Sequence, residues 1–94
     1  MLFMVEMQVN IPLSLDPGIA DALKKEEKEM SQRLQREGKW RDLWRVVGQY
    51  ANVSIFNVAG NDELHQLLSA LPLYPFMSIR VTPLAQHPSA IAAI

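Results

Sequence analysis

Cysteine is absent from this chain, so no disulfide can form and no thiolate is available as a nucleophile or a metal ligand. Neither sign of charge is in excess, because nine Lys and Arg residues face ten Asp and Glu residues. That balance provides no broad basic field for nucleic acid or an anionic membrane. No apolar run is of transmembrane length, and Glu6 interrupts the apolar N-terminus where a signal peptide would continue. A cytoplasmic protein is expected.

Apolar residues are plentiful and make up 49% of the 94 residues. A chain of this length forms a single domain, expected here over 1–94, which buries only about 60–65% of the surface that its unfolded form exposes. The apolar content is high for so small a core. Part of it is therefore expected to lie between subunits of an oligomer.

Hydrophobic periodicity and turn residues predict four strands and two helices in the order β-α-β-β-α-β. The strands are expected over 2–10, 43–47, 53–56 and 76–82, and the helices over 17–37 and between Asn61 and Pro72. This order is typical of ferredoxin-like folds, an α+β class in which two helices cover one face of a four-stranded antiparallel sheet.

Local chemistry accounts for the expected ends of the helices. Asp16 is a helix cap, and Pro17 follows at the first helical position, where its missing N–H costs nothing. Gly38 supplies the left-handed residue that ends this helix. Asn61 is expected to cap the second helix.

The face of the sheet away from the helices is expected to be covered by a second subunit. It includes residues too apolar for open water, among them Leu2, Met4, Trp44 and Val46. The apolar tail from Ile91 to Ile94 is expected to help cover a neighbour.

The long helix carries the charged run K-K-E-E-K-E at 24–29. One interpretation is a solvated face stabilised by pairs four residues apart. Helical spacing from Leu23, however, places Glu26 in the middle of the apolar stripe and Glu27 on its flank. A half-buried carboxylate has a raised pKa and suits a general base near neutral pH, whereas a salt bridge to Arg33 or Arg45 would give it a structural role.

Three polar residues of the central hairpin, Arg45, Tyr50 and Asn52, also have two interpretations. In the structural interpretation, Arg45 is an outward-facing strand residue, Tyr50 packs on the turn and Asn52 forms the turn. Equally, an arginine can bind a substrate carboxylate, while a tyrosine and an asparagine can donate hydrogen bonds to a developing enolate oxygen. Spacing alone does not choose between them. His65 and His87 have no further ligand at metal-binding spacing, so no metal site is expected.

Four runs carry a resemblance to a known family over essentially the whole chain. They are L-K-x-x-E-K-E-x-S-Q-R-L-Q-R-E-G-K-W (23–40), L-W-R-V-V-G-Q-Y-A-N-V-S-I-F-N-V (43–58), N-D-E-L-H-Q-L-L-S-A-L-P-L-Y-P-F-M (61–77) and H-P-S (87–89). Together they closely resemble the muconolactone Δ-isomerases. The resemblance implies small ferredoxin-like subunits that pair into dimers and assemble into a decamer, with active sites at subunit contacts and no metal or organic cofactor.

The resemblance also implies a reaction and its residues. Family members convert muconolactone to 3-oxoadipate enol-lactone by a 1,3-proton shift, in the catechol branch of the β-ketoadipate pathway of aromatic degradation. The family's helix glutamate falls on Glu27, and Lys24 lies one turn before it. The resemblance implies that both are catalytic residues. Tyr50 and Asn52 are implied to orient the lactone, whereas three cations are candidates for binding its carboxylate: Arg45, Lys24 and His87.

Two departures from the family pattern bear on the substrate. Many of these isomerases have His in place of Met4 and Tyr in place of Val53, whereas relatives that act on chlorinated muconolactones are similarly apolar there. Both positions are expected in the pocket wall. A muconolactone isomerase is therefore the first expectation, with a chloromuconolactone dehalogenase and a non-catalytic oligomeric module as alternatives.

Overall fold

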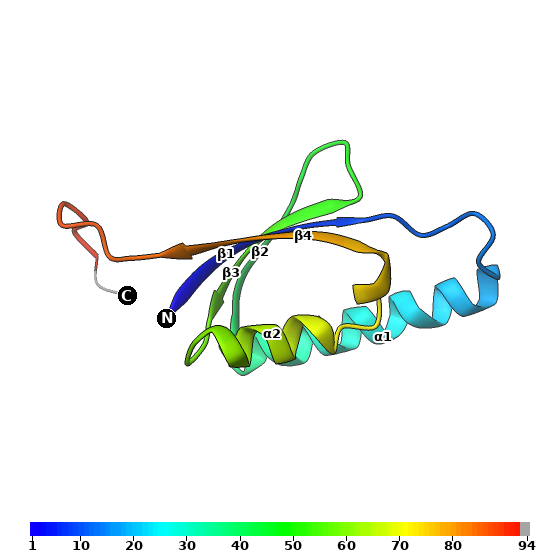
Figure 1. The fold of residues 1–94 in the computed structure, drawn as a ribbon, viewed down its shortest axis with the longest axis horizontal. Helices are drawn as coiled ribbons and strands as arrows, with labels where there is room; N and C mark the ends of the chain where they lie inside the picture. Colours follow the sequence, from blue (N-terminus) through cyan, green and yellow to red (C-terminus); the bar gives the residue numbers. More distant parts are fainter. Residues whose placement is uncertain (93–94) are drawn as a thin grey trace.

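The computed structural model describes residues 1–92, and its elements follow the expected order. They are β1 (Leu2–Val9), α1 (Pro17–Arg36), β2 (Trp40–Arg45), β3 (Ala51–Asn57), α2 (Asn61–Ser69), a 3₁₀ turn η1 (Tyr74–Phe76) and β4 (Met77–Leu84). The four strands form one antiparallel sheet in the order β2-β3-β1-β4. Both helices lie against the same face of the sheet (Figure 1). This α+β architecture confirms the predicted β-α-β-β-α-β topology.

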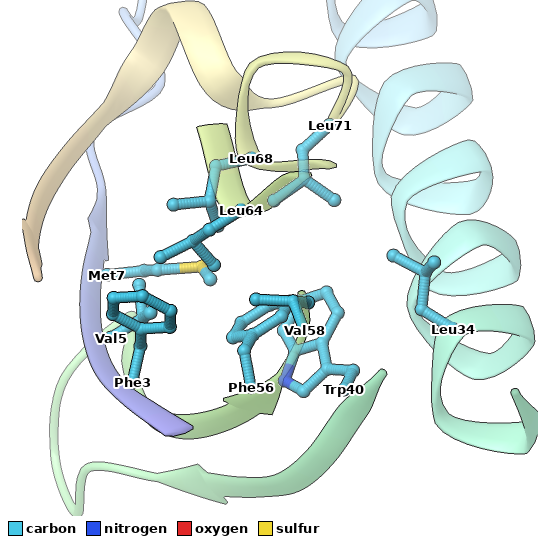
Figure 2. Packing of buried hydrophobic residues seen from close by; sticks show 10 residues of the cluster. All are labelled: Phe3, Val5, Met7, Leu34, Trp40, Phe56, Val58, Leu64, Leu68 and Leu71. Carbon is cyan, nitrogen blue, oxygen red and sulfur yellow. The ribbon is translucent and has the colours of Figure 1, made fainter. Parts of the chain in front are cut away.

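The core lies between the sheet and the two helices. Register places Phe3 opposite Phe56 and Val5 opposite Ser54, so alternate residues of β1 and β3 share the inner face. In Figure 2, leucines of α2 and Leu34 of α1 point toward these strands. The buried cluster comprises Phe3, Val5, Met7, Leu34, Trp40, Phe56, Val58, Leu64, Leu68 and Leu71. The described residues include no helix that is long and apolar enough to cross a membrane.

The hairpin strands are longer than the sequence predicted. β2 begins at Trp40 rather than at residue 43, because a register shift between Trp40 and Asp42 breaks the alternation by which a strand is recognised. The Trp40 and Phe56 rings pack with centroids 4.8 Å apart. The turn that follows runs through Gly48, which has a φ of 81° and therefore uses the left-handed region that glycine tolerates.

The prediction that Asn61 caps α2 was wrong. Gly60 holds the cap position and makes no side-chain hydrogen bond, while Asn61 is the first helical residue. Glu63 instead reaches back, and its Oε1 accepts a hydrogen bond of 2.9 Å from the N–H of Ala59. An acidic side chain at this end also complements the helix dipole. α2 ends at Ser69, before Pro72, and η1 continues to β4.

The last strand extends through Pro83, where the sequence predicted its end. β4 lies at an edge of the sheet and pairs only with β1. An edge strand tolerates a proline, because no strand on its other side needs the missing N–H as a hydrogen-bond donor. Beyond β4, Ile91 is fully exposed. Residues 93–94 of the tail expected to cover a neighbour lie outside the described residues.

The sheet face away from the helices carries apolar side chains that are uncovered in one chain, together with the charged pair of register partners Glu6 and Arg80. Trp44 is 68% exposed and pairs with Val53, and Met4 pairs with Ile55 on the same face. The exposure of an indole ring of this kind is typical of a surface that another molecule covers. That a second subunit covers this face, as expected from the sequence, stays a prediction.

Candidate active site

A pocket of about 480 Å³ lies between α1 and the inner face of the sheet, beside the turn that joins β2 and β3. Its lining residues come from every strand, from α1, from the turn between β2 and β3 and from the connection after α2: Val9, Lys24, Glu27, Lys28, Ser31, Trp40, Leu43, Arg45, Tyr50, Ala51, Asn52, Leu73 and Met77. Its volume is that of a site for a small molecule. Of the six site residues named from the sequence, all but His87 line this pocket.

Glu27, and not Glu26, is the acid at the edge of the core. Ala20 and Leu34 are buried on α1, and Glu27 lies midway between them at a spacing of seven residues, or about two turns. The three therefore share one face. Glu26 is exposed, so the spacing argument that placed it in the middle of the stripe was wrong. It relied on Leu23, which lies at the margin of the buried face.

The Glu27 carboxylate is half-buried and held at one oxygen. The backbone N–H of Leu73 donates a hydrogen bond of 3.0 Å to Oε1. Burial raises the pKa of Glu27 above its ordinary value, and the Leu73 hydrogen bond offsets part of that increase. Within residues 1–92 no Lys or Arg nitrogen lies within 4.0 Å of Glu27, and Arg33 pairs with Glu37 instead. The expected salt-bridge alternative is therefore not formed.

Cationic side chains surround the pocket opening. Lys24 and Lys28 are exposed residues of α1 on either side of Glu27. Across the pocket, Arg45 is anchored to the hairpin turn: its Nη1 donates to the carbonyl oxygen of Gln49 at 3.4 Å, and its guanidinium lies 5.5 Å from the centre of the Tyr50 ring. A guanidinium that lines a pocket suits the binding of a small carboxylate.

Asn52 supplies a hydrogen-bond donor to the pocket from β3. Its Oδ1 accepts a hydrogen bond of 2.7 Å from the hydroxyl of buried Ser54. The Nδ2 amide group makes no hydrogen bond within the described residues, so both of its donors are available to a bound molecule. Tyr50, 44% exposed, adds a phenolic hydroxyl at the same side.

Three other positions from the sequence prediction lie away from this pocket. His87 is exposed in the segment after β4, where its Nδ1 accepts a hydrogen bond of 3.0 Å from the N–H of Ser89. Met4 and Val53, expected in the pocket wall, lie instead on the opposite face of the sheet, because their register partners Ile55 and Glu6 point outward. Residues 1–92 hold no cluster of three His, Cys, Asp or Glu suited to a metal ion.

Sequence reasoning missed two polar features of the site. The Leu73 N–H is a backbone group, so no pattern of side chains in the sequence predicts its position in the site. Lys28 belongs to the charged run at 24–29 and was given no role of its own in the site. Its spacing of four residues from Lys24 is the signal that both line one opening.

A half-buried carboxylate of raised pKa, facing hydrogen-bond donors and cations in one pocket, defines an acid–base enzyme for a small anionic molecule. A family model described as muconolactone delta-isomerase matches residues 1–90. The chain belongs to the muconolactone delta-isomerase family.

Individual relatives support the assignment along the whole chain. The chain is 58% identical to the muconolactone delta-isomerase of Cupriavidus pinatubonensis, over 97% of this chain and 99% of that one. It is 54% identical to that of Pseudomonas aeruginosa, over 99% and 97%. A crystal structure of muconolactone isomerase superposes with a TM-score of 0.95 at 52% identity and covers 100% of this chain and 98% of that one. The family resemblance predicted from the sequence is confirmed.

Proposed function

We propose that this chain is a muconolactone delta-isomerase in which Glu27 carries the proton. The observation that carries the proposal is the half-buried Glu27 carboxylate in a pocket that also presents Asn52, Tyr50 and Arg45. Family membership over the full length of the chain supports the same activity.

The proposed reaction is a proton transfer within one lactone ring. Glu27 removes the proton from the ring carbon that bears the acetate arm, and the C–H electron pair passes through the ring double bond to the lactone carbonyl oxygen. The resulting dienolate takes the proton back two carbons away, beside the carbonyl, so that the double bond moves and the carboxylate is regenerated. One base on one face of the ring serves both steps.

Four other polar residues of the pocket have roles in this scheme. The amide of Asn52 and the hydroxyl of Tyr50 donate hydrogen bonds to the dienolate oxygen, whose charge is greatest in the transition state. Arg45 binds the acetate carboxylate, and Lys24 adds positive charge beside the base. Burial raises the pKa of Glu27 toward neutral pH. A carboxylate whose pKa is higher binds a proton more strongly and is therefore a better general base.

We further propose that subunits pair through the outer face of the sheet and that the pairs assemble into a decamer. The support is the apolar outer face around Trp44. His87, far from the pocket of its own chain, would in such an assembly be free to approach a neighbour's pocket. A cytoplasmic role in the catechol branch of the β-ketoadipate pathway follows from the same activity.

A turnover assay tests the proposal directly. Purified protein is mixed with muconolactone, and double-bond migration is followed by ultraviolet absorbance. Formation of the enol-lactone at an enzymatic rate is expected, whereas no turnover would reject the activity. Chloro- and methyl-substituted lactones in the same assay test the alternative substrate class, which Met4 and Val53 no longer support because neither lines the pocket. Chloride release faster than isomerisation would make the chain a dehalogenase.

A further inference from the structure

Ser54 is a polar residue at the centre of an apolar core. It has no exposed surface, and it lies between Val5 of β1 and Leu43 of β2, its register partners on the inner face. Burying a hydroxyl without a partner costs on the order of 1–3 kcal/mol. An alanine or valine would avoid that cost, so the hydroxyl must be matched by an interaction.

The only side-chain partner of Ser54 within the described residues is Asn52. The two residues point to the same face of β3, two positions apart, and the Ser54 hydroxyl donates to Asn52 Oδ1 at 2.7 Å. An asparagine amide carries its acceptor and its two donors on opposite sides. With the amide reversed, Ser54 would accept from Nδ2, and its own buried O–H would lose the only side-chain acceptor that it has within the described residues. The observed orientation is therefore favoured, and it turns the Nδ2 donors away from Ser54.

We propose that Ser54 is a positioning residue that orients the Asn52 amide so that its N–H groups, and not its oxygen, face the lactone. Without this hydrogen bond the amide rotates between two orientations. In the wrong orientation its oxygen meets the negatively charged dienolate oxygen and repels it. The inference rests on the proposed isomerase activity and assigns a role to a residue that never touches the substrate.

A double-mutant cycle tests this role. Ser54→Ala is expected to lower kcat about 10-fold with KM nearly unchanged, because the cations that bind the carboxylate are not altered. Asn52→Ala is expected to lower kcat about 10²-fold, in the range found when one oxyanion donor is removed. In the Asn52→Ala background, adding Ser54→Ala should lower kcat no further. Independent losses that multiply would overturn the inference, because they would mean that Ser54 acts without Asn52.

Ser54→Thr separates orientation from stability. Threonine retains the hydroxyl but adds a methyl group to a packed core, so its unfolding midpoint is expected to fall while kcat stays within about 2-fold of wild type. Ser54→Ala should show the reverse, a nearly unchanged midpoint with reduced kcat. If kcat instead follows the midpoint in all variants, Ser54 is only structural. Absence of turnover in the wild type would reject the proposed activity itself, and wild-type turnover with an unaffected Ser54→Ala would reject this inference alone.

Discussion

The backbone N–H of Leu73 lies 3.0 Å from Oε1 of Glu27, although 46 residues separate the two along the chain. Leu73 lies in the connection between α2 and β4, which runs beside α1 (Figure 1). The hydrogen bond occupies one carboxylate oxygen, so in the proposed reaction Oε2 is the oxygen that accepts and returns the proton. In the proposed reaction α1 thus supplies the base, and the connection between α2 and β4 holds one of its oxygens.

Glu27→Gln should separate activity from stability. We expect kcat to fall about 10²–10⁴-fold, the usual contribution of a general base. Because burial raises the pKa of Glu27 in the folded state, ionised Glu27 opposes folding at pH values above that raised pKa. The neutral amide removes this cost and keeps an acceptor for Leu73. The unfolding midpoint at pH 7.5, measured by calorimetry, should therefore rise.

Glu26→Gln is the matched control for this substitution. The same change one residue earlier alters an exposed carboxylate on α1. It should leave both kcat and the unfolding midpoint close to wild type. If Glu26→Gln abolishes turnover while Glu27→Gln retains it, the base has been assigned to the wrong residue.

The rate should fall at acid pH as Glu27 becomes protonated. Its folded pKa is raised, so the acid limb of kcat/KM is expected above the ordinary glutamate value near 4.5. The Leu73 N–H lowers the pKa of Glu27, and its removal should move the limb to higher pH. Replacing Leu73 by its α-hydroxy acid, which exchanges the N–H for an ester oxygen, makes that change without altering the side chain.

An ester at Leu13 is the control for this experiment. Leu13 is fully exposed in the loop before α1, outside the pocket. Its ester should leave the pH profile unchanged. An acid limb at the same pH in the Leu73 ester and the wild type would show that this hydrogen bond does not stabilise the ionised base.

The topology and most element bounds were predictable because they depend on local patterns. Alternation over β1 and helical spacing in α2 are intact in the sequence, and the structure places both elements within two residues of expectation. The start of β2 was not predictable, since the register shift after Trp40 depends on pairing with Phe56 across the sheet. Local periodicity carries no information about such a partner.

The site was predictable only in part. Glu27, Arg45, Tyr50 and Asn52 have side chains whose chemistry suggests a role, and the pocket brings them together. Which glutamate is half-buried depends on the packing of α1 against the sheet and the Leu73 connection, and helical spacing from one leucine misjudged it. Such a choice requires tertiary structure.

Arg45→Met should weaken substrate binding more than Lys24→Met. Both side chains are exposed, but the Arg45 guanidinium already contacts Gln49 and Tyr50 and so loses less freedom when it binds a carboxylate. Lys24 makes no such contact within residues 1–92. A charge-assisted hydrogen bond contributes about 1.5–3 kcal/mol, so KM should rise about 10–150-fold with a smaller change in kcat. Steady-state kinetics at fixed ionic strength measure both.

Arg36→Met is the control for loss of one positive charge. Arg36 ends α1 outside the pocket, and its removal should leave KM unchanged. His87→Ala tests His87, the third candidate for binding the substrate carboxylate. A larger rise in KM for His87→Ala than for Arg45→Met would mean that a neighbouring subunit's tail, and not the hairpin, binds the carboxylate.

Trp44→Glu should break the assembly without unfolding the subunit. The indole projects from the outer face of the sheet, is 68% exposed and lies outside the core cluster of its own chain. Covering about 150 Å² of apolar surface per ring stabilises an interface by about 4 kcal/mol, and a buried glutamate would oppose it further. Light scattering should show a large particle for wild type and a much smaller one for the variant.

Gln32→Glu, an exposed substitution on α1, controls for the added negative charge and should leave the particle size unchanged. Circular dichroism should show the same secondary structure in all three proteins. If wild type is a stable monomer, the outer face is not an interface between copies. If Trp44→Glu retains the wild-type mass, the subunits meet through another surface. A dissociated but folded variant with normal turnover would further show that one chain holds the complete site.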